Sequence, residues 1–273
     1  MKVIDFDGLF DEKLTQYMKE SGKKRTEKQW EDLIPKLYKK FGDTYIAKMK
    51  CTPKEYYAHM TDEALCQTLS GHLYENIPVP EFLINELEKR DVVECLLPLL
   101  KSEDAEVAAY AVNLIGNDAR ALDMYFSILE DEDGDVDLKS DVIALLCENA
   151  DLVKAQALQA YQKGVEEECM LKVLANVVER SEEIYQILLT AFLKAEDWQI
   201  SLRADNLARY GDERALPHLL RKLEDPSIGF VEFQELKYAV EALGGEYNEE
   251  RDFTLDKDYL RVQSAAAKAE ENK

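Results

Sequence analysis

The sequence is poor in residues that interrupt helices, because its 273 positions include only eleven glycines and seven prolines. No apolar run approaches the roughly 20 residues that a membrane-spanning helix needs. The opening residues, MKVIDFD, bring in acidic side chains before the hydrophobic segment of a secretory signal could form. Hydrophobic residues nevertheless make up 46% and charged residues 33%, which is typical of an ordered globular chain. We expect a soluble, cytoplasmic protein.

Metal-ligating residues are also scarce and poorly spaced. The chain has three histidines and five cysteines. Cys51, His59, Cys66 and His72 fall within one window of 22 residues. Structural zinc sites use close pairs such as C-x₂₋₄-C, and this window contains none. We therefore expect reduced thiols among core and surface residues, with no metal ion and no cofactor.

Basic side chains are in deficit, with 34 Lys and Arg against 56 Asp and Glu, for a net charge of −22. The deficit is confined to one part of the chain: residues 1–90 hold 15 basic and 16 acidic side chains, whereas residues 91–273 hold 19 and 40. Such an acidic surface repels nucleic-acid phosphates and anionic lipid. It favours a basic partner or plain solubility, so we expect neither nucleic acid nor a membrane as partner.

One internal repeat is visible. The segment YAVNLIG at 110–116 reappears as YAVEALG at 238–244, an offset of 128 residues or four steps of 32. The tripeptide RAL occurs at 120–122 and again at 214–216, an offset of 94 residues that is close to three such steps. Periods of 20 to 50 residues are typical of proteins built from stacked structural repeats.

Apolar residues between these anchors recur at intervals of three and four, which predicts amphipathic helices, and no strand pattern competes. The spacing predicts five helix pairs: 91–101 with 105–116, 119–130 with 136–149, 151–163 with 166–180, 182–195 with 198–210, and 213–224 with 229–243.

Residues 1–90 lack the repeat, but the spacing of their apolar residues also indicates helices. The pattern predicts helices at 13–20, 27–41, 53–60, 62–74 and 81–89. The sequence Thr52-Pro53-Lys54-Glu55 predicts a capping box at a helix start, and Pro35 is expected to kink or split its helix. The prolines around residues 78–80 mark the expected joint with the repeats, and residues 265–273 are expected to be a frayed helix or a disordered tail.

The segment GDERALPHLL at 211–220, followed by LEDP at 223–226, resembles the HEAT-like repeats of phycobilisome lyases and many bacterial proteins. The resemblance is strong over this repeat, fair over 92–122 and weak over 151–180. It implies an all-α fold: a right-handed α-solenoid of about five HEAT-like helix pairs over 91–245, with an N-terminal helical cap at 1–90 and a C-terminal extension at 246–273.

No catalytic grouping stands out. The acidic run at 131–137 begins like a calcium loop, but its glycine comes too early and Val142 occupies the place of the bidentate glutamate. The sequence Asp5-Phe6-Asp7-Gly8 has the form of a phosphatase aspartate pair, yet no strand precedes it. The His-Glu dipeptides of HEAT-like hydroxylases are absent, and so is any Ser/His/Asp set or phosphate-binding loop. No catalytic or cofactor-binding residue is predicted.

In solenoids of this kind the second helix of each pair lines the concave face, where partners bind. Steps of about 32 residues select Tyr110, Asn113, Asp141, Asn176, Asp205, Tyr238 and Glu241 as partner-binding positions. These residues suit a basic protein or peptide, although the same positions also fit an ordinary solvated helix face. The leading interpretation is a non-enzymatic scaffold or adaptor, and the alternative is a HEAT-like lyase or cofactor-handling protein.

A basic cluster lies in the N-terminal region, with several acidic side chains among it. Its members are Lys19, Lys23, Lys24, Arg25, Lys28, Lys36, Lys39 and Lys40. The cluster could dock on the acidic repeats and cover their groove, or it could bind an acidic partner. The sequence does not choose between these alternatives, and it does not indicate an oligomeric state.

Overall fold

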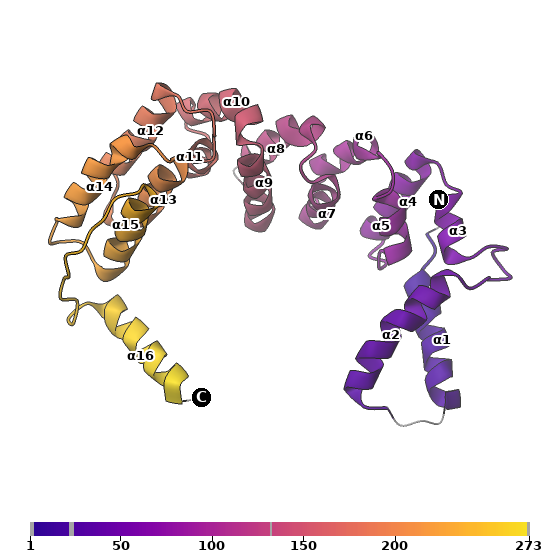
Figure 1. Ribbon diagram of the computed structural model, residues 1–273. Coiled ribbons are helices and arrows are strands. Elements are labelled where there is room, and N and C mark those ends of the chain that lie inside the picture. The colour runs from indigo at the N-terminus through magenta and orange to yellow at the C-terminus, as the bar shows by residue number, and fades with distance from the viewer. Residues whose placement is uncertain (1–2, 22–24, 132, 272–273) are drawn as a thin grey trace. The chain divides into compact units, whose positions relative to one another are not determined.

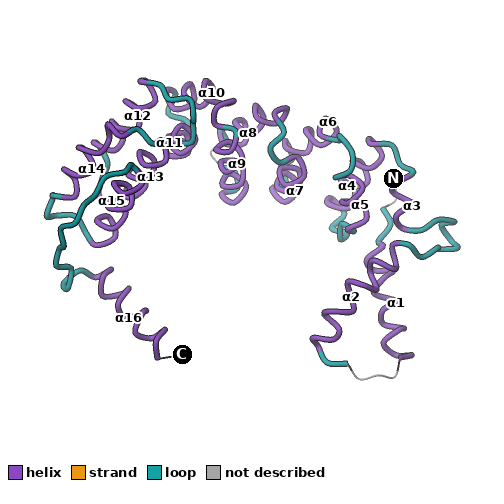
Figure 2. Tube along the Cα trace, in the orientation of Figure 1, coloured by secondary structure: helices purple, strands orange, loops and turns teal. Residues whose placement is uncertain are grey.

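The computed structural model describes residues 3–21, 25–131 and 133–271. These residues form sixteen α-helices and four short 3₁₀ helices, without a β-strand (Figures 1 and 2). The prediction of an all-α chain is confirmed. None of these helices is long and apolar enough to cross a membrane. The chain divides into two compact units, Met1–Val142 and Ile143–Lys273.

The first unit contains α1 (Phe6–Ser21), α2 (Glu27–Gly42), α3 (Pro53–Ala58), α4 (Asp62–Tyr74), α5 (Glu81–Leu87), α6 (Val93–Leu96), η1 (Leu97–Lys101), α7 (Ala105–Ile115), η2 (Ala119–Ala121) and α8 (Leu122–Leu129). The division between the units falls within α9 (Val136–Glu148). The second unit continues with α10 (Ala150–Gln162), α11 (Glu167–Ala175), α12 (Glu182–Leu193), η3 (Asp197–Gln199), α13 (Ile200–Tyr210), η4 (Glu213–Ala215), α14 (Leu216–Leu223), α15 (Phe230–Ala242) and α16 (Lys257–Glu271).

Most predicted helices have a counterpart within a few residues, and three details differ. Helix α1 begins at Phe6, seven residues early, because the Asp5 carboxylate accepts a hydrogen bond from the Gly8 backbone N–H (2.7 Å) and caps the helix. Helix α2 is continuous through Pro35, so the prediction of a split is wrong. Both Pro35 and Glu31 are exposed, so water can satisfy the Glu31 carbonyl that proline leaves without a donor. The C-terminal segment, expected to be a frayed helix or a disordered tail from residue 265, is helical as far as Glu271.

Threonine caps start three of the N-terminal helices. The predicted capping box is confirmed: the Thr52 hydroxyl accepts from the Glu55 N–H (3.1 Å), and the Glu55 carboxylate accepts from the Thr52 N–H (2.9 Å). Thr26 and Thr61 cap α2 and α4 in a similar way. Because these side chains satisfy backbone groups at the helix start, the short helix α3 has a defined first turn.

The helices of the second unit form two sets according to how they pack. Helices α11, α13 and α15 pack side by side, and α10, α12 and α14 each pack against the helix that follows them. Apolar residues such as Leu188, Leu207 and Leu236 fill the space between them and are almost fully buried. This arrangement leaves one side of α13 and one side of α15 without a helical neighbour, as their exposed residues show.

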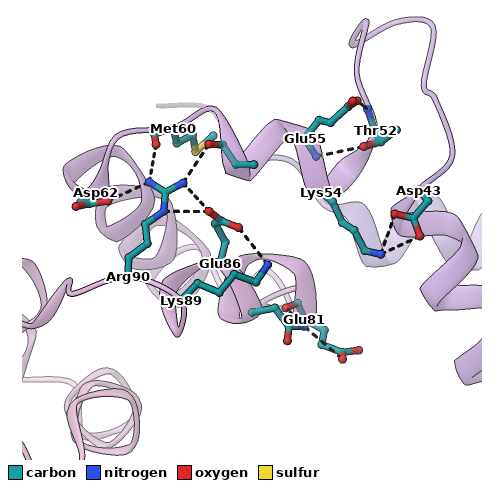
Figure 3. Close-up of polar contacts among 12 residues, drawn as sticks. Asp43, Thr52, Lys54, Glu55, Met60, Asp62, Glu81, Glu86, Lys89 and Arg90 are labelled. Carbon is teal, nitrogen blue, oxygen red and sulfur yellow. Dashed lines mark hydrogen bonds and ion pairs between the residues drawn. The ribbon is translucent and has the colours of Figure 1, made fainter.

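Arginine side chains hold neighbouring turns together. In the first unit the Arg90 guanidinium donates to the carbonyls of Met60 (2.8 Å) and Ala58 (3.1 Å), and also to the Asp62 and Glu86 carboxylates (Figure 3). Carbonyls at helix ends have no intrahelical donor, and this side chain supplies one. A single arginine thereby joins the α3–α4 turn to the end of α5.

Two further arginines repeat one pattern in the two units. Arg120 bonds to Asp118 in its own turn and to Asp91 (2.6 Å) of the preceding helix pair. Arg214 likewise bonds to Asp212 and to Glu182 (2.7 Å) of the preceding pair. The arginine beside Asp118 lowers the pKa of that carboxyl to about 2. The repeated RAL segments therefore carry the same contact to the previous pair.

A buried tyrosine makes a comparable link in the second unit. Tyr210, at the end of α13, donates its hydroxyl proton to the Ser181 carbonyl (3.0 Å) and accepts from the Ser181 N–H (2.6 Å). Ser181 in turn caps α12, because its side chain accepts from the Ile184 N–H. One hydroxyl thus satisfies both backbone groups of the residue that starts the neighbouring helix.

We expect Tyr210→Phe to lower the free energy of unfolding of the second unit by about 1–2 kcal/mol, because it takes the hydroxyl partner from the half-buried Ser181 N–H and leaves the Ser181 carbonyl with only the Tyr185 N–H. Urea unfolding followed by Trp198 fluorescence, in a Trp30→Phe background, measures this change. Tyr238→Phe is the matched control, since that hydroxyl is exposed and its loss should change stability by less than about 0.5 kcal/mol. Equal effects of the two substitutions would contradict the proposed role of Tyr210.

Candidate functional site

The predicted partner-binding positions of the second unit lie on consecutive helices of one layer. Asp205 is exposed on α13, and Tyr238 and Glu241 are exposed on α15, with Tyr238 at 60% exposure. Asn176 directly follows α11 and is half-buried, and its amide donates to the Lys172 carbonyl (2.8 Å). The Asn176 amide therefore bonds to a carbonyl at the end of its own helix, whereas the other three residues face solvent.

The remaining predicted positions belong to the first unit. Tyr110 and Asn113 lie on α7, and Asp141 lies on α9. Asn113 and Asp141 are exposed, but Tyr110 is half-buried and its burial raises the pKa of its phenol. Asn113 and Asp141 are therefore accessible to a partner, and no described contact joins the three residues into one site.

Exposed apolar side chains accompany the predicted residues of the second unit, and the sequence analysis missed them. Trp198 is 70% exposed, Leu202 39% and Val231 40%. Offsets of 33 residues relate Trp198 to Val231, Leu202 to Glu235 and Asp205 to Tyr238. Leu202 and Asp205 therefore take the places on α13 that Glu235 and Tyr238 take on α15, and Trp198 lies in η3, directly before α13. We call this surface the α13–α15 face and define it as Trp198, Leu202, Asp205, Val231, Glu235, Tyr238 and Glu241.

The opposite side of α13 anchors the helix. Arg203 and Asn206 are buried there, and the Arg203 guanidinium forms an ion pair with the Glu168 carboxylate of α11. Gln199 also donates to Glu168 (2.9 Å). Buried charged contacts of this kind specify how two helices pack, because an unpaired buried arginine is costly. The α13–α15 face is therefore presented from an anchored helix.

The face combines apolar side chains with carboxylates. The Trp198 indole N–H donates to the Glu196 carboxylate (2.7 Å), which leaves most of the ring open to solvent. Asp205 has a nearby cation in Arg209 (3.4 Å), whereas no ion pair with a described residue is present for Glu235 or Glu241. Exposed tryptophan and tyrosine are typical anchors of protein interfaces.

A second cluster, buried in the first unit, joins four helices. The Tyr38 hydroxyl of α2 donates to the Asp7 carboxylate of α1 (2.5 Å). Tyr57 of α3 and His72 of α4 are both 0% exposed, and neither the Tyr57 hydroxyl nor the His72 ring nitrogens make a hydrogen bond within the described chain. Sequence analysis considered Asp7 and His72 separately, and the fold brings them together.

The protonation of this cluster follows from its burial. Desolvation raises the pKa of Asp7, against the lowering effect of the Tyr38 hydrogen bond. Desolvation also raises the pKa of Tyr57 and lowers that of His72, so both groups prefer the neutral state. Shifted pKa values often mark active sites. Here two of the four side chains are closed to solvent, so a substrate could not reach them, and we interpret the cluster as part of the core.

The four residues considered for zinc do not form a site. His59 is exposed, Cys51 is half-buried, and Cys66 and His72 are buried. Among the described residues there is no group of three or more histidine, cysteine or acidic side chains that could hold a metal ion. Burial also raises the pKa of Cys66 to about 12, which disfavours the thiolate that binds metal.

We expect the stability of the first unit to fall as the pH is lowered from 7.5 to about 5.5. The folded pKa of His72 lies below its ordinary value near 6.5, so only the unfolded chain gains a proton readily in this window. The slope for one proton is at most about 1.4 kcal/mol per pH unit. Asp7 acts in the opposite direction, because desolvation raises its pKa in the folded chain.

Urea unfolding at several pH values, followed by Trp30 fluorescence in a Trp198→Phe background, tests this expectation. His72→Leu should flatten the pH dependence, because the buried titrating group is gone. His59→Gln should leave it unchanged, since that histidine is exposed. An unchanged slope in His72→Leu would assign the pH dependence to other groups.

Comparison with known proteins adds no relative to these observations: no protein-family model and no curated protein matches this sequence.

Proposed function

We propose that this chain is a non-enzymatic protein-interaction scaffold or adaptor, and that its second unit holds a basic segment of a partner protein on the α13–α15 face. The observation that carries the proposal is the exposure of Trp198 and Tyr238 on the same face as Asp205 and Glu235. Tryptophan and tyrosine are enriched among the residues that contribute most to binding at protein interfaces.

The proposal includes an architecture for residues 91–245: a right-handed HEAT-like α-solenoid of five helix pairs, capped by residues 1–90. Three observations support it. The helix pairs follow one another at the repeat spacing, the second helices α11, α13 and α15 pack in sequence, and Arg120 and Arg214 each contact the preceding pair. In such arrays the second helices form the binding surface.

The chemistry of the partner follows from the charge around the face. Residues 143–273 contain 16 basic and 26 acidic side chains, so the surroundings attract a cationic segment. The apolar residues of the face would then contact the apolar side of that segment, while Glu235 and Glu241 meet its lysines or arginines. Trp198 and Tyr238 would supply most of the affinity as rigid anchors.

Binding can be tested with a fluorescein-labelled amphipathic peptide rich in Lys and Arg, titrated with the full chain and followed by anisotropy. We expect affinity that weakens as salt increases, because surface charges are screened. Trp198→Ala with Tyr238→Ala, and separately Asp205→Lys with Glu235→Lys, should each weaken binding about tenfold or more.

The matched control for charge is Glu213→Lys with Glu224→Lys, two exposed acidic residues outside the face. This variant changes the net charge by the same amount and should bind within about threefold of the parent chain. If the control variant loses as much affinity as the face variants, the peptide is attracted by overall charge only. The assignment of the face as the binding site would then be wrong.

A further inference from the structure

The hairpin of α1 and α2 contains an open apolar groove that the proposed function does not use. The cavity has a volume of about 160 Å³. Each helix contributes four residues at the same intervals of three, one and three: Phe10, Lys13, Leu14 and Tyr17 from α1, and Leu37, Lys40, Phe41 and Thr44 from α2 and the turn after it. The groove therefore follows about two turns of both helices.

Two aromatic pairs join the helices of this hairpin. Phe10 and Phe41 lie 5.6 Å apart by ring centroids, and Tyr17 and Trp30 lie 6.5 Å apart. Tyr17 is 38% exposed, and only Phe41 and Gly42 are buried among the sixteen residues of α2. An amphipathic helix normally buries its apolar stripe against a neighbour. Here the stripe on α2 is only partly covered by α1.

Lysines form the polar rim of this groove. Lys13 and Lys40 are exposed and line the cavity, which has no carboxylate in its lining. Neither lysine has an ion-pair partner among the residues that the structure describes. The Lys13 ammonium lies 4.9 Å from the centre of the Phe41 ring. Although the whole chain is strongly acidic, this groove presents unpaired positive charge beside apolar side chains.

We propose that the α1–α2 groove binds an amphipathic helix of a partner protein, with an apolar stripe flanked by Asp or Glu. The lining repeats at helical intervals, which matches a helix that inserts apolar residues one turn apart. The carboxylates of that helix would meet Lys13 and Lys40. The cavity is smaller than the 300–1,000 Å³ that is typical of small-molecule sites, which favours a few inserted side chains over a whole ligand.

This inference is independent of the proposed function. The groove lies in the first unit and selects acidic partners, whereas the α13–α15 face lies in the second unit and selects basic partners. Loss of either activity would leave the other intact.

The probe is a labelled synthetic helical peptide with leucines at intervals of three and four, flanked by glutamates. Two further peptides serve as controls: a scrambled version, and a version with lysine in place of glutamate. The full chain with Trp198→Ala and Tyr238→Ala, which removes the anchors of the α13–α15 face, should show saturable binding of the first peptide by anisotropy and no binding of the two control peptides. Lys13→Glu with Lys40→Glu should weaken that binding about tenfold or more, and should bind the lysine peptide at the groove instead.

The matched control variant is Lys28→Glu with Lys36→Glu, because both lysines are exposed on α2 and neither lines the cavity. It should bind the acidic peptide within about threefold of the parent chain. Leu14→Ser removes an apolar side chain from the groove and should weaken binding without changing the charge. Circular dichroism would check that each variant keeps its helices. The proposal is overturned by absence of binding at about 1 mM peptide, by equal binding of the scrambled peptide, by equal loss in the control variant, or by binding of anionic lipid vesicles without the peptide.

Discussion

The fold depends on satisfying the backbone groups at the ends of many short helices. A chain with this many helices exposes many terminal N–H and carbonyl groups, and it has no described sheet to pair them. Side chains from neighbouring helices supply the partners: Arg90 and Arg251 donate to pairs of carbonyls, and Asp151 accepts from the N–H groups of Val178 and Glu179. These contacts join segments 26 to 32 residues apart in the sequence, so they hold helix ends to neighbouring parts of the fold.

This way of joining the helices determines where function can reside. Contacts between pairs are made at the turns and on the inner sides of the helices, where Tyr210 and Arg203 lie. The solvent-facing sides of the helices make no such contacts, so their residues can vary without loss of the fold. Trp198 and Tyr238 lie on outer sides and contribute little burial to the core. Their exposure therefore calls for an explanation outside folding, which a partner would provide.

The sequence predicted the helices well because apolar spacing, threonine caps and turn residues are local signals. It placed the start of α1 too late because the cap at Asp5 was considered only as a catalytic motif, and it overestimated the effect of Pro35, which lies on an exposed side. Leu202 and Trp198 precede Asp205 by three and seven residues, so helical spacing could have placed them on the side predicted for Asp205. The α1–α2 groove and the contact of Asp7 with Tyr38 depend on tertiary packing, and spacing in the sequence cannot reveal them.

The two proposed surfaces would differ in how their partners arrive. A chain of net charge −22 attracts a basic segment from a distance, so the overall field would assist binding at the α13–α15 face. The same field repels an acidic helix until it comes within about 8 Å, the screening length at physiological salt, where Lys13 and Lys40 dominate. Added salt would therefore weaken association at the α13–α15 face more than association at the α1–α2 groove. It screens an attractive field for the basic partner and a repulsive field for the acidic one. Different salt responses follow from one charge distribution, because steering depends on the whole chain and contact depends on a few residues.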